Sequence, residues 1–214
     1  NRRPDSGQAR LRYGLCMNKP DAPACARNRD PILQVLRVYL ANHHHVLEIG
    51  SGTGQHAVYF AAAMPWLQWQ CSDRPEYLSG IEAWRVEAGL ANTPAPLSLD
   101  VALGPWPARR FDAVFTANSL HIMGWPEVEA FFAGLANVLA EQATLVVYGP
   151  FNYGGQFTSD SNRAFDASLR ARDAKMGIRD FESIDALARG IGLRLVEDVA
   201  MPANNRCLVW RRAG

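Results

Sequence analysis

The feature that most constrains this chain is a short apolar run that ends in an acid and three alternating glycines. It reads Val-Leu-Glu-Ile-Gly-Ser-Gly-Thr-Gly over residues 46–54. Glycines at this spacing let a strand turn sharply and let the backbone approach a ligand that side chains would keep away. Residues 55–64 have the composition of a helix whose N-terminus would face that ligand. The pattern predicts a strand, a nucleotide-binding loop and a helix.

Two other interpretations of this loop stay open. A dinucleotide-binding fingerprint has the spacing G-x-G-x-x-G, and here Gln55 stands where its last glycine would be. The glycines could also serve a purely structural turn. The spacing favours a nucleotide-like ligand other than a dinucleotide.

Length and composition limit the rest of the fold. With 214 residues, of which 48% are hydrophobic, the chain is long enough for one well-buried domain and too short for two. Lys and Arg number 22 against 21 Asp and Glu, so no overall positive field favours nucleic acid. No apolar run approaches the ~18 residues of a membrane span. The polar residues 1–12 also lack the apolar core of a signal peptide.

Cysteine and histidine usage indicates no metal site. The four cysteines lie far apart without a C-x-x-C pair, which argues against zinc and against a disulfide framework; they are Cys16, Cys25, Cys71 and Cys207. Three consecutive histidines, 43–45, precede a predicted strand and are interpreted as a helix-to-strand turn. We therefore expect a cytoplasmic protein that uses no metal.

Hydrophobic periodicity predicts strands that alternate with helices. Strands are predicted over 46–49, 67–71, 96–99, 111–117, 144–148, 193–199 and 206–211. Helices are predicted over 30–40, 55–64, 76–87, 127–139, 162–175 and 183–189. Such alternation indicates an α/β fold with a mostly parallel sheet covered by helices on both faces.

The start of the chain is predicted to be an appendage. Residues 1–26 are rich in Arg, Pro and Ala without clear periodicity, which indicates an arm or lid, and 27–214 would form a single domain. The first helix is predicted to begin at Asp30, because Asp is a good N-cap and Pro31 would take the first helical position.

Acidic residues follow two of the predicted strands, at the edge where an open α/β sheet binds its ligand. Asp73 comes where an acid accepts hydrogen bonds from ribose hydroxyls, although a lone Asp there is also a common helix cap. Asp100 is placed to accept from an adenine amino group, with Val101 packed on the ring. A turn before Gly104-Pro105 explains Asp100 equally well.

The fourth predicted strand is followed by Asn118-Ser119-Leu120-His121, with Trp125 close behind. His121 is the best candidate for a general base, because imidazole titrates near neutral pH and can take a proton from a hydroxyl, thiol or amine. The alternative is a histidine that only packs and hydrogen bonds.

Two later loops are candidates for substrate contact. Residues 149–157 carry three aromatics among glycines, which either close over a flat substrate or dock on the core. The hairpin 201–205 is predicted to open on the same edge of the sheet. Its Asn204 and Asn205 are either turn formers or amides that hold the substrate.

Six ordered segments resemble one known family: residues 27–33, 51–57, 117–122, 148–152, 165–169 and 201–205. Together with Glu48 and the glycine spacing, they resemble the methyltransferase-like 26 family of class I S-adenosylmethionine-dependent methyltransferases, long listed as a domain of unknown function. The resemblance covers about residue 22 to the C-terminus. It implies a Rossmann-like class I methyltransferase fold with a seven-stranded, mostly parallel sheet, an antiparallel last strand and helices on both faces.

The resemblance also implies a cofactor and a site. The cofactor would be S-adenosyl-L-methionine, which becomes S-adenosyl-L-homocysteine, without a metal. Residues expected to bind it are Asn28, Arg29, Glu48, Gly50, Ser51, Gly52, Thr53, Gly54, His56, Asp73, Arg74, Asp100, Val101, Asn118 and Ser119. Residues expected to contact the substrate are His121, Trp125, Tyr148, Phe151, Asn152, Tyr153, Phe157, Asn204 and Asn205.

We therefore expect a methyltransferase that acts on O, N or S of a small aromatic or heteroaromatic molecule. A longer N-terminal arm than the family pattern indicates a specialised substrate in secondary metabolism. An RNA or protein methyltransferase is the first rival; it is disfavoured because no basic stripe interleaved with aromatics occurs and residues 118–121 lack an Asn-Pro-Pro-aromatic motif. A cofactor-binding protein without catalysis is the second. We expect a monomer or homodimer without a membrane partner.

Overall fold

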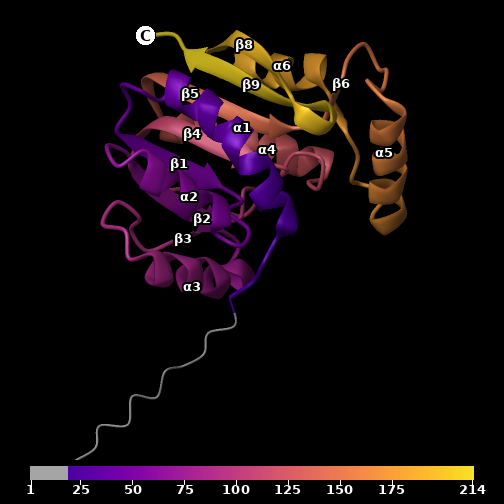
Figure 1. Ribbon diagram of the computed structural model, residues 1–214. Coiled ribbons are helices and arrows are strands. Elements are labelled where there is room, and N and C mark those ends of the chain that lie inside the picture. The colour runs from indigo at the N-terminus through magenta and orange to yellow at the C-terminus, as the bar shows by residue number, and fades with distance from the viewer. Residues whose placement is uncertain (1–18) are drawn as a thin grey trace, which may run out of the picture.

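Seven strands form the main sheet of the computed structural model, which describes residues 19–214 (Figure 1). Their spatial order is β3 (Leu97–Ser98), β2 (Gln68–Asp73), β1 (His45–Ile49), β4 (Phe111–Ala117), β5 (Leu139–Gly149), β9 (Asn205–Arg212) and β8 (Leu193–Met201). Six of these strands run in the same direction, and β9 alone runs opposite to them. The predicted fold class is confirmed, including the antiparallel last strand.

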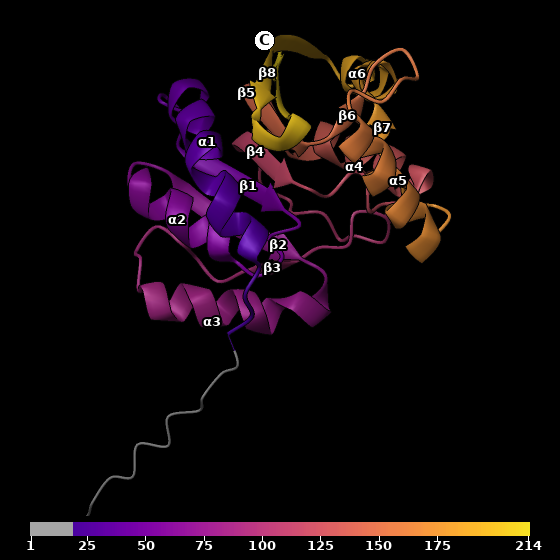
Figure 2. The same ribbon diagram turned by 45° about the vertical axis from the view of Figure 1, so that its right-hand side comes forward.

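Six α-helices of the described part accompany this sheet. They are α1 (Pro23–Tyr39), α2 (Gln55–Ala63), α3 (Leu78–Ala88), α4 (Trp125–Val138), α5 (Asp160–Arg172) and α6 (Phe181–Gly190), with 3-10 turns η1 (Pro75–Tyr77) and η2 (Pro202–Asn204). Figure 1 shows α5 standing beside the sheet at one end. Figure 2 shows α1 and α2 on one side and α4, α5 and α6 on the other. No helix within residues 19–214 is both long enough and apolar enough to cross a membrane.

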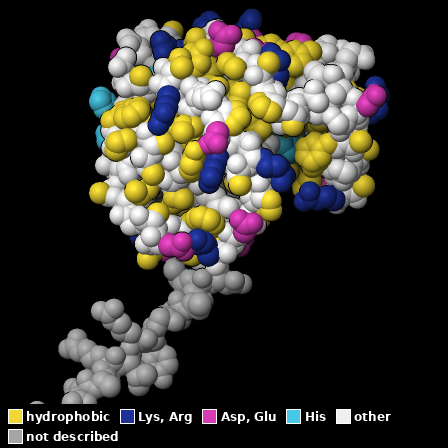
Figure 3. Space-filling model, in the orientation of Figure 1, with side chains coloured by type: hydrophobic (Ala, Val, Ile, Leu, Met, Phe, Trp, Pro, Cys, Tyr) yellow, Lys and Arg dark blue, Asp and Glu magenta, His cyan; other side chains and the backbone are white. Residues whose placement is uncertain are grey.

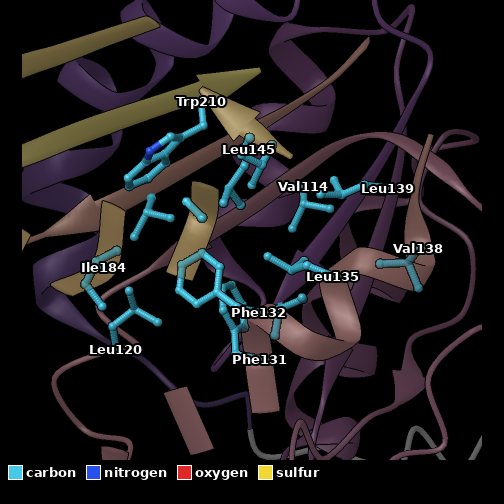
Figure 4. Packing of buried hydrophobic residues seen from close by; sticks show 14 of the residues in the cluster. Val114, Leu120, Phe131, Phe132, Leu135, Val138, Leu139, Leu145, Ile184 and Trp210 are labelled. Carbon is cyan, nitrogen blue, oxygen red and sulfur yellow. The ribbon is translucent and has the colours of Figure 1, made fainter. Parts of the chain in front are cut away.

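Two hydrophobic clusters, one on each face, hold the helices to the sheet. Alternate residues of each central strand point to opposite faces. In β5, Val146 therefore packs under α1 and α2, whereas Leu145 packs under α4 and α6. Figure 4 shows the second cluster, where Phe131 and Phe132 of α4 lie below Trp210 of β9. The central strands are buried on both faces, which explains their nearly continuous apolar sequences.

The strand order reverses between β1 and β4, and this fixes where a ligand can bind. The connections after the two strands leave in opposite directions, which opens a crevice at their carboxyl ends. The glycine loop follows β1 and residues 118–121 follow β4. The β8–β9 hairpin opens on the same edge, as predicted, because Arg206 pairs with Gly149 at the end of β5.

The predicted start of the first helix is wrong. Helix α1 begins at Pro23, and Pro31 lies inside it. Asp30 does not cap the helix; its carboxylate accepts a hydrogen bond from the Tyr59 hydroxyl. Residues 19–22 also belong to the fold, since the Ala22 N–H donates to Gln55 Oε1 at 2.7 Å. The rest of the predicted arm, residues 1–18, lies outside the described residues.

A second, two-stranded sheet was not predicted. It joins β6 (Phe151–Asn152) to β7 (Arg179–Asp180) in parallel. It turns the first part of the predicted loop 149–157 into regular structure. Within the histidine run 43–45, His43 and His44 lie in the connection from α1 to β1, as predicted, whereas His45 is already the first residue of β1.

Candidate cofactor and substrate site

The glycine loop is held at both ends and open in the middle. Gly50, Gly52 and Gly54 all have positive φ, at 71°, 61° and 89°. A Cβ on Gly50 would lie 2.7 Å from Ser119 Oγ, and one on Gly54 would lie 3.1 Å from the Ile81 backbone. Gly52 is exposed and has no atom within 4 Å of its Cβ position. The loop can therefore receive a ligand at Gly52.

Asp73, at the end of β2, lies directly beside this open glycine. Its Oδ2 accepts from the Gly52 N–H at 2.7 Å and its Oδ1 from the Arg74 N–H at 2.8 Å. Burial raises the pKa of Asp73, and the Gly52 and Arg74 N–H groups oppose that shift. The Arg74 side chain is exposed and lies against Tyr77. The structure thus brings Asp73 to the glycine loop and turns Arg74 toward solvent.

Glu48 lies beneath the loop, only 2% exposed. Its Oε2 accepts from Trp69 Nε1 at 2.9 Å. Burial raises the pKa of this carboxyl to about 7, although hydrogen bonds from Trp69 and Ser51 act in the opposite direction. Glu48 therefore carries only part of its charge near neutral pH. Thr53, in the loop above, donates to Gln55 Oε1 at 2.8 Å.

A polar network from three elements borders the site. His56 Nε2 lies 2.7 Å from Asn28 Oδ1, so α2 is joined to α1. Burial, followed by the charge of Arg29, lowers the pKa of His56 to about 4, which leaves the ring neutral. Burial raises the pKa of Tyr148, and hydrogen bonds with Asn28 and Asn205 oppose this.

Arg29 itself lies on the outer side of this network. Its guanidinium is 4.3 Å from the centre of the Tyr59 ring. Together with Cys25 and Trp84, it lines an apolar groove of about 280 Å³ on the outer surface of α1, α2 and α3. Asn28 therefore points toward the strand ends, whereas Arg29 does not.

Asp100 has the turn role that the sequence left open. Its Oδ1 accepts from the backbone N–H groups of Ala102 and Leu103 at 2.9 and 3.1 Å. Val101 is half-buried and packs against the core below α4. Both residues thus have structural partners within the chain.

His121 lies where the ends of β4 and β5 converge. A Cβ on Gly149 would be 3.8 Å from His121 Nδ1 and 3.9 Å from Asn118 Oδ1. Asn118 has a φ of 54° and donates its N–H to Tyr148 O. Ser119 Oγ is held by the Thr116 hydroxyl at 2.9 Å. The segment 118–121 therefore faces the glycine loop through Ser119 and Gly149, at the end of β5, through His121.

The imidazole of His121 is unprotonated at neutral pH and is a weak base. The residue is 6% exposed, and burial, then Arg179, then Arg172, lower its pKa to about 4. Its ring meets the edge of Phe165 with centroids 5.3 Å apart and has no hydrogen bond to another residue of 19–214. Figure 3 shows a hollow with histidine atoms inside it and with Lys or Arg and hydrophobic side chains at its rim.

The aromatic residues of the predicted substrate loop dock on the protein instead. Phe151 is 2% exposed in the core. Tyr153 stacks on Phe181 and donates to Asp198 Oδ2 at 2.7 Å. Phe157 lies half-buried below the Arg163 guanidinium. For Phe151 and Tyr153 the structure thus shows the second of the two alternatives for this loop, docking on the protein, and Tyr153 is held by β8 and α6.

The remaining predicted substrate residues lie in three different settings. Trp125 lines a separate polar cavity of about 230 Å³ with Arg179. Asn205 donates to Pro202 O at 3.3 Å and Asn204 to Ser161 Oγ at 3.3 Å, so both serve the hairpin and its contact with α5. Asn152 is buried and its Oδ1 has no hydrogen-bond partner in the described residues.

Sequence reasoning missed α5 as a wall of the site. Its Asp166 is buried and accepts from the Ile178 N–H at 2.8 Å, and the neighbouring Gly177 N–H donates to His121 O at 3.0 Å. The two contacts fix α5 beside His121. One signal in the sequence could have revealed it: Phe165 and Arg172 are seven residues apart, on one face of a helix whose other residues are mostly polar.

The comparisons with known proteins agree with this architecture. An O-methyltransferase family protein from Burkholderia thailandensis matches with a TM-score of 0.78 and 15% identity over 90% of this chain and 58% of its own. An O-methyltransferase family 2 protein from Planctomyces limnophilus, solved with apigenin, matches with a TM-score of 0.77 and 16% identity. The match covers 89% of this chain and 60% of that protein. Mitomycin 7-O-methyltransferase matches with a TM-score of 0.73 and 20% identity, over 86% of this chain and 54% of its own length.

These similarities define a Rossmann-like methyltransferase fold of class I. This chain spans 54% to 60% of the length of those three proteins. A family model described as "Protein of unknown function (DUF938)" matches residues 19–212. The chain therefore belongs to the DUF938 family.

Proposed function

We propose that this protein is an S-adenosylmethionine-dependent methyltransferase that modifies O, N or S of a small aromatic or heteroaromatic molecule. Membership of the methyltransferase-like 26 family, a role in secondary metabolism and a cytoplasmic monomer or homodimer are parts of the same proposal. The observation that carries it is the meeting of an open glycine loop, Asp73 and His121 at one edge of a methyltransferase fold.

The chain's own residues fit the proposed cofactor. The space at Gly52 admits a ligand that any side chain there would exclude, and Asp73 lies beside it with a carboxylate suited to ribose hydroxyls. The neutral polar groups of Asn28, His56 and Tyr148 would border its amino-acid end. When bound, S-adenosylmethionine supplies a methyl group attached to a positive sulfur. When the methyl group is transferred, the electron pair of the carbon–sulfur bond stays with the sulfur.

His121 would act on the acceptor. With a pKa of about 4 it is unprotonated at neutral pH, so it can receive a proton, although it is a weak base. A weak base is enough for a hydroxyl acceptor, because that hydroxyl becomes strongly acidic as its oxygen bonds to the methyl carbon. Alignment of the acceptor by the walls of the site would contribute much of the remaining rate.

Transfer of a labelled methyl group tests the proposal. The purified protein is incubated with labelled S-adenosylmethionine and, in parallel, with small-molecule extract, total RNA or protein. We expect label in small molecules, reduced by Asp73→Asn and retained in the control Asp173→Asn, which changes an exposed acid at the end of α5. Label in RNA or protein alone would contradict the small-molecule proposal.

A further inference from the structure

An aromatic side chain of α5 lies beside His121. Phe165 of α5 meets the His121 ring at an interplanar angle of 72°, and 39% of its surface is exposed. An exposed Phe on the inner side of α5 gives a flat molecule a surface to lie on. Since α5 is fixed through Asp166 and Gly177, this wall is a permanent part of the site.

The charged groups that act on His121 are positive. The two charged groups that shift the pKa of His121 are both arginines, Arg179 of β7 and Arg172 of α5. Arg179 is occupied, since its guanidinium donates to Leu120 O, Met123 O and Lys175 O. The nearby carboxylate of Asp166 is occupied as well, by Arg170 at 2.8 Å.

Arg172 is different from these neighbours. It is exposed and makes no ion pair or hydrogen bond within residues 19–214, and it acts on His121 through its charge. It follows Phe165 by two helical turns, so the two side chains lie on the same face of α5. A guanidinium in this position is free to bind a carboxylate with two parallel hydrogen bonds.

We infer that the methyl acceptor is an aromatic acid, whose ring lies against Phe165 and His121 and whose carboxylate binds Arg172. This inference rests on the proposed function and names its substrate class. The carboxylate is the anchor, and the methylated atom is another group on the ring. A neutral aromatic molecule would lack the hydrogen-bonded ion pair with Arg172, which explains the discrimination that we expect.

Binding of such an acid also changes the chemistry of His121. Burial lowers the pKa of His121 most, and the positive charges of Arg179 and Arg172 lower it further. A carboxylate on Arg172 opposes this field, so the pKa of His121 rises when the acid is bound. The site thus gains a stronger base only with the correct class of substrate.

Matched acids and amides test the inference. The protein, saturated with S-adenosylhomocysteine, is titrated with 4-hydroxybenzoate and 4-hydroxybenzamide, and with 6-hydroxy-2-naphthoate and its amide. We expect each acid to bind about tenfold more tightly than its amide, as for one charge-assisted contact. Arg172→Gln should remove this preference. The control Arg163→Gln removes an equal charge from the same helix and should preserve it.

A second readout follows the His121 ring by NMR during pH titration. The acids should raise its pKa and the amides should not, and Arg172→Gln alone should raise it in the absence of a probe. Equal binding of acids and amides, a preference that survives Arg172→Gln, or no binding of any probe while S-adenosylhomocysteine binds would each overturn the inference. Failure of S-adenosylhomocysteine itself to bind would instead overturn the proposed function.

Discussion

The Ser119 hydroxyl occupies the space that a side chain at Gly50 would need. A Cβ on Gly50 would lie 2.7 Å from Ser119 Oγ, and Gly50 has a φ of 71°. The loop after β1 and the loop after β4 therefore touch at a point where only glycine fits. This contact joins the proposed cofactor side of the site to the segment that carries His121.

Gly50→Ala should destabilise the protein by about 2 to 4 kcal/mol. Left-handed φ costs an L-residue about 1–2 kcal/mol, and the overlap with Ser119 costs a similar amount. Urea unfolding measures the change. The double variant Gly50→Ala with Ser119→Ala should recover part of the loss, because the clashing oxygen is gone. In Gly190→Ala, where nothing lies within 4 Å, the free energy of unfolding should stay within about 1 kcal/mol of the native value. A similar loss in both single variants would contradict the contact.

Glu48 should make stability depend on pH. Its pKa in the folded protein is about 7, above the ordinary value of 4.5, so the folded state holds the proton more tightly than the unfolded state. The contribution of Glu48 to the free energy of unfolding is therefore fully present below pH 4.5 and is lost as the pH rises through about 7. The total loss is about 3 kcal/mol.

Urea unfolding at a series of pH values measures this slope. Glu48→Gln keeps the side-chain shape and an acceptor for Trp69, so it should flatten the curve between about pH 4.5 and 7. The exposed Glu141→Gln is the control and should leave the slope in place. An unchanged slope in Glu48→Gln would show that another group titrates.

His121→Asn should separate turnover from cofactor binding. We expect turnover to fall about 100-fold or more, while affinity for S-adenosylhomocysteine changes less than about threefold. Because the pKa of His121 is about 4 in the free protein, kcat/KM should show no inflection from this group between about pH 5.5 and 8. Unchanged turnover would remove His121 as the base.

Asp166→Ala should loosen α5. Asp166 is 5% exposed and bonds to both Arg170 and the Ile178 N–H, so its loss leaves a buried donor without a partner. The substitution should lower the free energy of unfolding by about 2–3 kcal/mol. Limited proteolysis should cleave the segment 157–178 faster than in the native protein. Asp160→Ala, which removes an exposed acid from the first turn of the same helix, should cost less than about 1 kcal/mol and leave the cleavage rate unchanged.

The sheet could be predicted from the sequence because its signals are local. Buried strands such as β4 are continuous apolar runs, and its predicted bounds, 111–117, are those of the structure. The alternation of strands with helices then determines which ends meet. Asp73 could therefore be placed near the glycine loop before any contact was known.

The errors lie where distant residues decide the local structure. Asp30-Pro31 has the signals of a helix start, yet α1 begins earlier because residues 22–28 are held by Gln55 and His56 of α2. Phe151 and Tyr153 were expected over a substrate. Phe151 pairs with β7 (Arg179–Asp180), which comes late in the chain and carries no signal of pairing in the local sequence, and Tyr153 follows directly after this pairing.

The proposed substrate wall was missed for a similar reason. Phe165 and Arg172 look like ordinary residues of an amphipathic surface helix. Their importance comes from the buried Asp166, which fixes α5 beside His121 through Ile178 and Gly177. Only the folded chain brings these residues together.

Calorimetric titration with S-adenosylmethionine and, separately, S-adenosylhomocysteine tests the central claim most directly. The account predicts that both bind at one site per chain, and that Asp73→Asn weakens both by about tenfold or more. Absence of binding heat for both, at protein and ligand concentrations well above micromolar and at two temperatures, would contradict the assignment of the glycine loop as a cofactor site.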